Sequence, residues 1–299
     1  MALRGAIFLR PQPHPPPLPS PSPYARRFRR SLVVVVAAAA ASRRRRPQNA
    51  DGEFFVDHRC IDCDTCRWMA PEVFARVDGK SAVTKQPSSE DEMIKALQGV
   101  YHCGYHSEKS YGATSYLITH PEGNILVDCP RYKEKLVRNI EMLGGARYMF
   151  LTHKDDVGDH EKWSKRLKCE RILHSGDVEA STADVEMKLH GEGPWSIGND
   201  FELVHTPGHT KGSVCLYYKP LKVLFTGDHL AKSEESDDLV IFPIYNRHSV
   251  SLQLDSVKKL INLNFEWILP GHGRRIRFKD NQEKNSALEA CLDKQLLYA

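Results

Sequence analysis

The stretch that decides the fold is HTPGHTKGSVCLYYKPLKVLFTGDHL, residues 205–230. It contains two short apolar runs, "SVCLYY" and "KVLFTGD", which indicate β-strands because turn-forming residues close each of them. A Pro-Gly turn carries His209 out of the strand that precedes these two, and the second run ends at Asp228. An imidazole and a carboxylate therefore follow strand ends, where loops on a rigid scaffold carry functional sites.

The same arrangement recurs on both sides of this stretch. Upstream, "YMFLTH" ends a predicted strand at His153, and downstream "WILPGHG" places His272 between two glycines. Imidazoles and carboxylates without thiolates suit Zn²⁺ or iron. A carboxylate such as Asp228 can also bridge two ions about 3.5–4 Å apart. The pattern predicts one metal centre of one or two ions, with His153, His209, Asp228 and His272 as ligands.

The order of these motifs resembles the metallo-β-lactamase fold superfamily, especially its glyoxalase II-like hydrolases. The resemblance covers roughly residues 99–280. It implies an α/β (α+β) fold, an αββα sandwich with the metal ions at one edge of the two sheets. It also implies that His209 is the third-site histidine, Asp228 the bridging carboxylate and His272 the final histidine.

The first motif, "LTHKDDVGDH" at residues 151–160, departs from the family pattern His-x-His-x-Asp-His. His153 matches the first histidine, but Asp155 stands at the second. In the preferred register, Asp159 and His160 are the Asp-His pair and bind metal. In the alternative register, two residues are deleted and Asp155-Asp156 is the pair.

The resemblance implies that a metal-bound hydroxide attacks the ester or thioester carbonyl of a small-molecule substrate. Asp155 or Asp159 would be catalytic, orienting the nucleophile or transferring its proton. No Ser-His-Asp or Cys-His pattern offers a competing nucleophile.

A cysteine cluster precedes this region, in "CIDCDTCRWMAPEVF". The spacing Cys60-x₂-Cys63-x₂-Cys66 predicts a 4Fe-4S cluster. Residues 54–98 resemble single-cluster ferredoxins, whose fourth ligand comes from a later Cys-Pro pair. Here that pair is missing, and Cys103 is the only nearby thiol. A complete cluster and an incomplete or empty site therefore both remain open.

The first 50 residues differ in composition from the rest of the chain. They hold ten arginines and no Asp or Glu, whereas residues 51–299 hold 32 Lys and Arg against 38 Asp and Glu. The basic, acid-free start predicts a disordered transit peptide, for chloroplasts in preference to mitochondria. Its apolar run, residues 32–41, is shorter than the ~20 residues that span a bilayer. We expect neither a membrane span nor nucleic-acid binding.

These features divide the chain into four expected parts. They are a transit peptide (1–50), a ferredoxin-like module with a hairpin at "VDGK" (51–98), a metallo-β-lactamase-like domain (99–280) and a C-terminal helix (281–299). The leading hypothesis is a metal-dependent hydrolase. The alternatives are an iron-dependent, flavodiiron-like oxidoreductase, which receives electrons from a partner through the cluster, and a non-catalytic scaffold or sensor.

Overall fold

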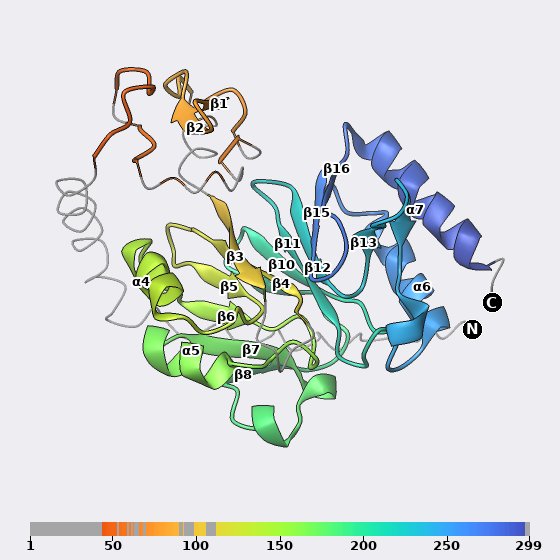
Figure 1. Ribbon diagram of the computed structural model, residues 1–299. Coiled ribbons are helices and arrows are strands. Elements are labelled where there is room, and N and C mark those ends of the chain that lie inside the picture. Colours follow the sequence, from red (N-terminus) through yellow and green to blue (C-terminus); the bar gives the residue numbers. More distant parts are fainter. Residues whose placement is uncertain are drawn as a thin grey trace, which may run out of the picture. The chain divides into compact units, whose positions relative to one another are not determined.

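The computed structural model describes residues 44–52, 54–58, 60, 62, 66–67, 70–89, 92, 99–105 and 112–296. From residue 99 onward they form two six-stranded sheets that face each other. The helices α4 (Glu134–Met142) and α5 (His160–Leu167) lie outside one sheet, and α6 (Val250–Leu260) and α7 (Asn281–Leu296) lie outside the other (Figure 1). The predicted αββα sandwich is confirmed.

The first sheet contains, in spatial order, β3 (Val100–Tyr105), β4 (Thr114–Ile118), β5 (Ile125–Val127), β6 (Tyr148–Phe150), β7 (Glu170–His174) and β8 (Met187–Leu189). β3, β4 and β5 pair antiparallel, and β5 through β8 pair parallel. Parallel strands bring their carboxyl ends to one edge of the sheet. The segment that carries His153 leaves β6 at this edge.

The second sheet contains, in spatial order, β16 (Ile276–Arg277), β15 (Trp267–Pro270), β12 (Val223–Gly227), β11 (Val214–Tyr218), β10 (Phe201–His205) and β9 (Trp195–Ile197). β12 and β15 pair parallel, although they are far apart in sequence. Their carboxyl ends are therefore neighbours, which brings Asp228 and His272 together.

The pattern of side chains along β11 shows why both faces of this sheet are covered. Val214, Leu216 and Tyr218 belong to the core between the two sheets, and Cys215 and Tyr217 belong to the core under α6 and α7. Successive side chains of a strand point to opposite faces, so a strand buried on both faces is apolar throughout. All five residues of β11 are buried.

Specific hydrogen bonds hold α5 in place and cap α6. Trp163 of α5 is fully buried, and its indole nitrogen donates a hydrogen bond to the Pro130 carbonyl at 2.6 Å. The Ser249 side chain caps α6 by accepting a hydrogen bond from the Leu252 backbone at 3.2 Å. None of the helices in the described part of the chain has the length and the apolar run needed to cross a bilayer.

The C-terminal helix α7 is part of the sandwich. Its Leu288 lies in the same buried core as the residues of α6. Lys284 is 1 % exposed, and its ammonium donates hydrogen bonds to the carbonyls of Ile261 and Leu263, just after α6. The ammonium also lies 4.8 Å from the centre of the Phe265 ring. These contacts fix α7 to the end of α6.

Three short helices and one ribbon complete the domain. The ribbon pairs β13 (Ala231–Lys232) with β14 (Leu239–Val240). The short helices are η1 (Ser175–Asp177), η2 (Ala180–Thr182) and η3 (Pro243–Tyr245).

The segment before residue 99 contains the predicted hairpin. β1 (Phe74–Val77) pairs antiparallel with β2 (Lys80–Val83), which confirms the turn at "VDGK". Asp78 and Gly79 have φ angles of 49° and 72°, as a two-residue hairpin turn requires. A small core of its own supports the hairpin, from Ala70, Val73, Phe74 and Val83. Residues 1–43 lie outside the described residues, as do most of residues 89–98.

Candidate metal centre

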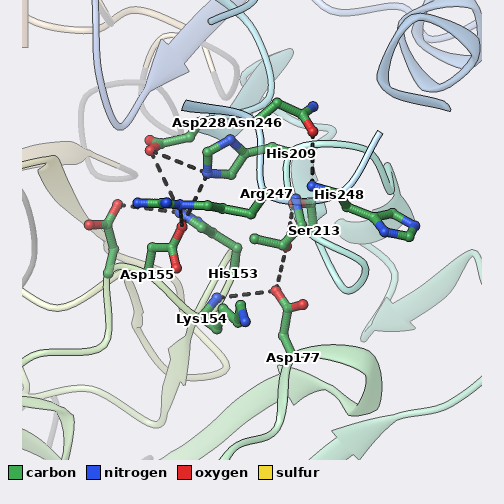
Figure 2. Close-up of polar contacts among 12 residues, drawn as sticks. His153, Lys154, Asp155, Asp177, His209, Ser213, Asp228, Asn246, Arg247 and His248 are labelled. Atoms are coloured by element: carbon green, nitrogen blue, oxygen red, sulfur yellow. Dashed lines mark hydrogen bonds and ion pairs between the residues drawn. The ribbon is translucent and has the colours of Figure 1, made fainter. Parts of the chain in front are cut away.

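Three imidazoles surround one carboxylate oxygen at the edge where the strands end. The Nε2 atoms of His153, His209 and His272 lie 3.6, 3.7 and 3.7 Å from Oδ2 of Asp228. In Figure 2, His153 and His209 point toward the Asp228 carboxylate. The structure thus brings together four residues that are scattered over 120 positions of sequence.

Two more carboxylates complete the cluster. Asp155 Oδ2 lies 3.5 Å from Nε2 of His209, and Asp156 Oδ2 lies 3.8 Å from Nε2 of His153. Ligand atoms of His153, Asp155 and His209 all lie within 4.8 Å of one another, and so do those of His153, Asp156 and Asp228. Each triad can contribute ligands to one ion.

The donor spacing and the burial both fit a cation. Ligands bound tetrahedrally at about 2.1 Å from Zn²⁺ are about 3.4 Å apart, close to the 3.5–3.8 Å seen here. Nε2 of His153, both ring nitrogens of His209 and Oδ1 of Asp228 are buried and have no hydrogen-bond partner among the described residues. Buried polar atoms without partners are costly, and a bound ion would satisfy them.

Burial shifts the protonation of these groups. It lowers the pKa of His153, which favours the neutral imidazole that can bind a metal ion. Burial, reinforced by the carboxylates of Asp156 and Asp128, raises the pKa of Asp228 well above its usual range. Carboxylates that repel one another in this way need a positive partner to stay ionised together.

A hydrogen-bonded pair orients His153. The Thr152 hydroxyl donates to the buried Asp128 carboxylate at 3.0 Å and lies 3.0 Å from Nδ1 of His153. Because the hydroxyl proton is used on Asp128, its oxygen accepts from the Nδ1–H of the ring. This tautomer leaves Nε2 with its lone pair directed into the cluster.

Asp177 fastens the loop that carries His209. Its carboxylate accepts hydrogen bonds from the Thr210 hydroxyl at 2.5 Å, the Gly212 backbone at 2.7 Å and the Lys154 backbone at 3.1 Å. Asp177 is 1 % exposed. It therefore joins the loop after β6 to the loop after β10, which sets the spacing between the two histidines.

Two glycines allow the close approach of these segments. Gly227 has a φ of +51°, and a Cβ there would lie 2.4 Å from Oγ1 of Thr152. A Cβ on Gly271 would lie 2.7 Å from Oδ1 of Asp228. Larger residues at either position would displace groups that hold or form the cluster.

Arg247 lies beside the cluster and comes from the turn before α6. Its backbone nitrogen donates a hydrogen bond to the His209 carbonyl at 2.7 Å. Its Nε lies 3.8 Å from Oδ2 of Asp155 (Figure 2). Contact with His209, and more weakly the charge of Arg247, lowers the pKa of Asp155.

Asp159 does not lie with the cluster in the contacts that the structure shows. Its carboxylate accepts a hydrogen bond from the Tyr132 backbone at 3.0 Å and lies 3.6 Å from the Lys162 ammonium. It is the residue that precedes the first turn of α5. These contacts give Asp159 a structural role and assign the position beside the ligands to Asp155.

His160 is likewise engaged elsewhere. Its Nδ1 accepts a hydrogen bond from Arg171 at 3.1 Å, and Arg171 is itself paired with Asp184 and Glu186. Burial and the Arg171 charge lower the pKa of His160. These contacts do not fit the preferred alignment of the first motif, in which Asp159 and His160 bind metal. They fit the alternative alignment, in which Asp155 and Asp156 are the pair.

A cavity of about 490 Å³ opens beside the cluster. His272 lines it, together with Tyr116, Trp267 and Arg274. The Tyr116 hydroxyl donates to the Pro270 carbonyl at 2.9 Å. This volume lies within the ~300–1,000 Å³ typical of small-molecule pockets.

The cysteine cluster is described in part. Cys60 and Cys66 are half-buried and form no disulfide among the described residues, and Cys63 lies outside them. Cys103 is in β3, where burial raises its pKa to about 12. Cys103 is therefore a protonated, buried thiol as long as no metal ion binds it.

Sequence reasoning missed the residues that support the ligands. Asp128 carried a usable signal, because it ends the strand "NILVD" as Asp228 ends its own. Thr152, Asp177 and Arg247 carried none, because their roles depend on segments that meet only in the folded chain.

Comparison with known proteins agrees with this geometry. A family model described as the metallo-beta-lactamase superfamily matches residues 146–272, and one described as the 4Fe-4S single cluster domain of ferredoxin I matches residues 56–107. The chain is 27% identical over 171 residues to lactamase-like protein aptB of Emericella nidulans, covering 54% of this chain and 51% of that protein. It is 27% identical over 122 residues to a hydroxyacylglutathione hydrolase of Pelagibacter ubique, covering 39% and 50%. The chain thus spans about half the length of these curated relatives.

Solved structures show the same fold. The metallo-β-lactamase DIM-1 aligns with a TM-score of 0.50 and 16% identity, over 69% of this chain and 95% of that one. TMB-1 aligns with a TM-score of 0.50 and 13% identity, over 64% and 93%. Residues 146–272 thus match the metallo-beta-lactamase superfamily model within a sandwich of the same fold, and residues 56–107 match the single-cluster ferredoxin domain.

Proposed function

We propose that the protein is a metal-dependent hydrolase that cleaves an ester or thioester bond of a small-molecule substrate. The observation that carries this proposal is the convergence of three imidazole Nε2 atoms, within 3.6–3.7 Å each, on one oxygen of Asp228. A zinc or iron ion held by these groups would lower the pKa of a bound water toward neutrality and polarise a carbonyl oxygen.

The surrounding residues have distinct roles in this reaction. Thr152 and Asp128 hold His153 in the tautomer that presents Nε2. Asp155 is the carboxylate placed to orient the attacking water, because it lies at the cluster and remains partly accessible, with 20 % of its side chain exposed. Substrate would enter from the cavity that His272 lines.

A second candidate is an iron-dependent oxidoreductase. It is favoured by one observation, the placement of Asp155 in the cluster where the usual first motif has a histidine. A 4Fe-4S cluster on Cys60, Cys63 and Cys66 would then supply electrons from a partner protein. The match of residues 56–107 to a ferredoxin domain supports the same cluster under either candidate.

Protein purified without air separates these candidates. We expect one or more zinc or iron ions beyond any cluster iron, and hydrolysis of thioesters or esters that His209→Ala abolishes. His190→Ala, at an exposed histidine, is the matched control and should leave activity unchanged. Oxygen or nitric oxide reduction without hydrolysis would favour the oxidoreductase. Absence of bound metal would refute both.

A further inference from the structure

We propose that this centre binds a single divalent cation and that the guanidinium of Arg247 occupies the electrostatic role of a second one. The inference rests on the proposed metal centre and specifies its composition. It follows from three observations on the ligands and on Arg247.

The first observation is that the two ligand triads share one residue. Both triads include His153, whose Nδ1 is engaged with the Thr152 hydroxyl at 3.0 Å. Only Nε2 remains, and one imidazole nitrogen offers one lone pair to one ion. The two triads therefore cannot each hold an ion with a full set of ligands.

The second observation is that the imidazole of His160 is hydrogen-bonded outside the cluster. His160 follows closely in sequence, but Arg171 donates to its Nδ1 at 3.1 Å. The Arg171 side chain is 4 % exposed and is itself fixed by Asp184 and Glu186. If one ion takes His153, Asp156 and Asp228, a second ion would have to rely on Asp155 and His209. The only other imidazole at Asp228 in the contacts described above is that of His272, whose side chain is 34 % exposed.

The third observation is that Asp155 already has a positive partner. Oδ2 of Asp155 lies 3.5 Å from Nε2 of His209 and 3.8 Å from Nε of Arg247. Among the described residues this is the only ion pair of Arg247, and its guanidinium makes no hydrogen bond. Arg247 is held there by its backbone, which donates to the His209 carbonyl at 2.7 Å.

In this position the positive charge of Arg247 limits the number of metal ions that the centre binds. A cation that approached Asp155 would meet the guanidinium, and like charges separated by a few ångströms repel. An arginine side chain carries a fixed positive charge, so this repulsion would act on every cation that approaches Asp155. The remaining carboxylates, Asp156 and Asp228, can hold one ion with the imidazoles.

Two other carboxylates nearby are already engaged in hydrogen bonds. Asp128 accepts hydrogen bonds from the backbone and the hydroxyl of Thr152. Asp177 accepts from Thr210 and Gly212. Both use their oxygens to hold loops, and neither belongs to a ligand triad.

The test counts bound ions in the full-length, metal-free chain. Mn²⁺ is the probe, because carboxylate and imidazole ligands accept it whereas the thiolates of the cysteine cluster favour softer ions. Calorimetric titration and the electron paramagnetic resonance signal of free Mn²⁺ both report stoichiometry without any substrate. Wild type should bind one equivalent tightly. Arg247→Gln should bind a second equivalent at least about tenfold more tightly than wild type does, since near-contact repulsion between a divalent ion and a guanidinium exceeds the 1.4 kcal/mol of a tenfold change.

Two controls isolate the charge. Arg247→Lys keeps the positive charge and should remain at one equivalent. Arg138→Gln removes an exposed arginine of α4 and should also remain at one. Far-ultraviolet circular dichroism verifies that each variant is folded. Two tight equivalents in wild type, or one in folded Arg247→Gln, would overturn the inference and leave the proposed hydrolase intact. Failure to bind Mn²⁺ or Zn²⁺ at all would overturn both.

Discussion

Thr152→Val tests whether the Asp128–Thr152–His153 chain controls the metal centre. The substitution keeps the size of the side chain and removes only its hydroxyl. That hydroxyl lies 3.0 and 3.1 Å from the two oxygens of Asp128 and 3.0 Å from Nδ1 of His153. Thr152 is 2 % exposed, so water cannot readily replace these contacts.

The structure sets the size of the effect. Asp128 keeps its hydrogen bond from the Thr152 backbone at 2.7 Å. Asp128 loses the hydrogen bond from the Thr152 hydroxyl, and a hydrogen bond to a charged group is worth about 1.5–3 kcal/mol. The N–H of the His153 ring also loses its acceptor. We expect the free energy of unfolding to fall by about 2–4 kcal/mol. We also expect metal affinity to weaken by about 10–100-fold, the usual effect of losing a partner that orients a ligand.

Chelator competition measures metal affinity, and urea unfolding of metal-free protein measures stability separately. Thr182→Val is the matched control, because Thr182 is also buried and its hydroxyl forms hydrogen bonds with the backbone of Glu179, the residue before η2. The control should lose about 1 kcal/mol of stability and no metal affinity. Metal affinity within threefold of wild type in folded Thr152→Val would refute the claim that Thr152 orients His153.

Three further outcomes are expected. Gly227→Ala should lower the free energy of unfolding by about 2–4 kcal/mol in urea titrations. A left-handed backbone costs a non-glycine residue about 1–2 kcal/mol, and the new Cβ would also lie 2.4 Å from Thr152. The control Gly145→Ala has a φ of +74° and nothing within 4 Å of its Cβ, so it should lose only the roughly 1–2 kcal/mol of the left-handed backbone. Burial lowers the pKa of His160 below its usual 6.5, so the unfolded chain binds a proton that the folded chain excludes. Stability should therefore fall as pH drops below 6.5, and His160→Gln should show a shallower fall between pH 7.5 and 5.5; an unchanged slope would contradict this. Residues 1–50 fused to a fluorescent protein should direct it to chloroplasts in plant cells, and a cytosolic signal would show that they are no transit peptide.

The fold could be predicted because its signals are local and repeated. Each strand ends in a turn residue, and the order of the strand-end histidines and aspartates is fixed in sequence. His209, Asp228 and His272 need no adjustment to meet in space, since the ends of β10, β12 and β15 share one edge.

The first motif could not be resolved from sequence in the same way. Asp155-Asp156 and Asp159-His160 both follow His153 closely, and spacing alone favours neither pair. The choice depends on Arg171, a residue of β7 whose hydrogen bond holds His160 at the start of α5. A contact between two separate elements produces no sequence pattern from which it could be predicted.

The buried ammonium of Lys284 has a practical consequence for dissecting this protein. The superfamily match stops at residue 272, which invites truncation just beyond it. A fragment shortened in that way would uncover Phe265 and strip the carbonyls of Ile261 and Leu263 of their donor. The shortest piece expected to fold independently must run to the end of α7, and acylation of this one amine should have much the same effect as cutting the helix away.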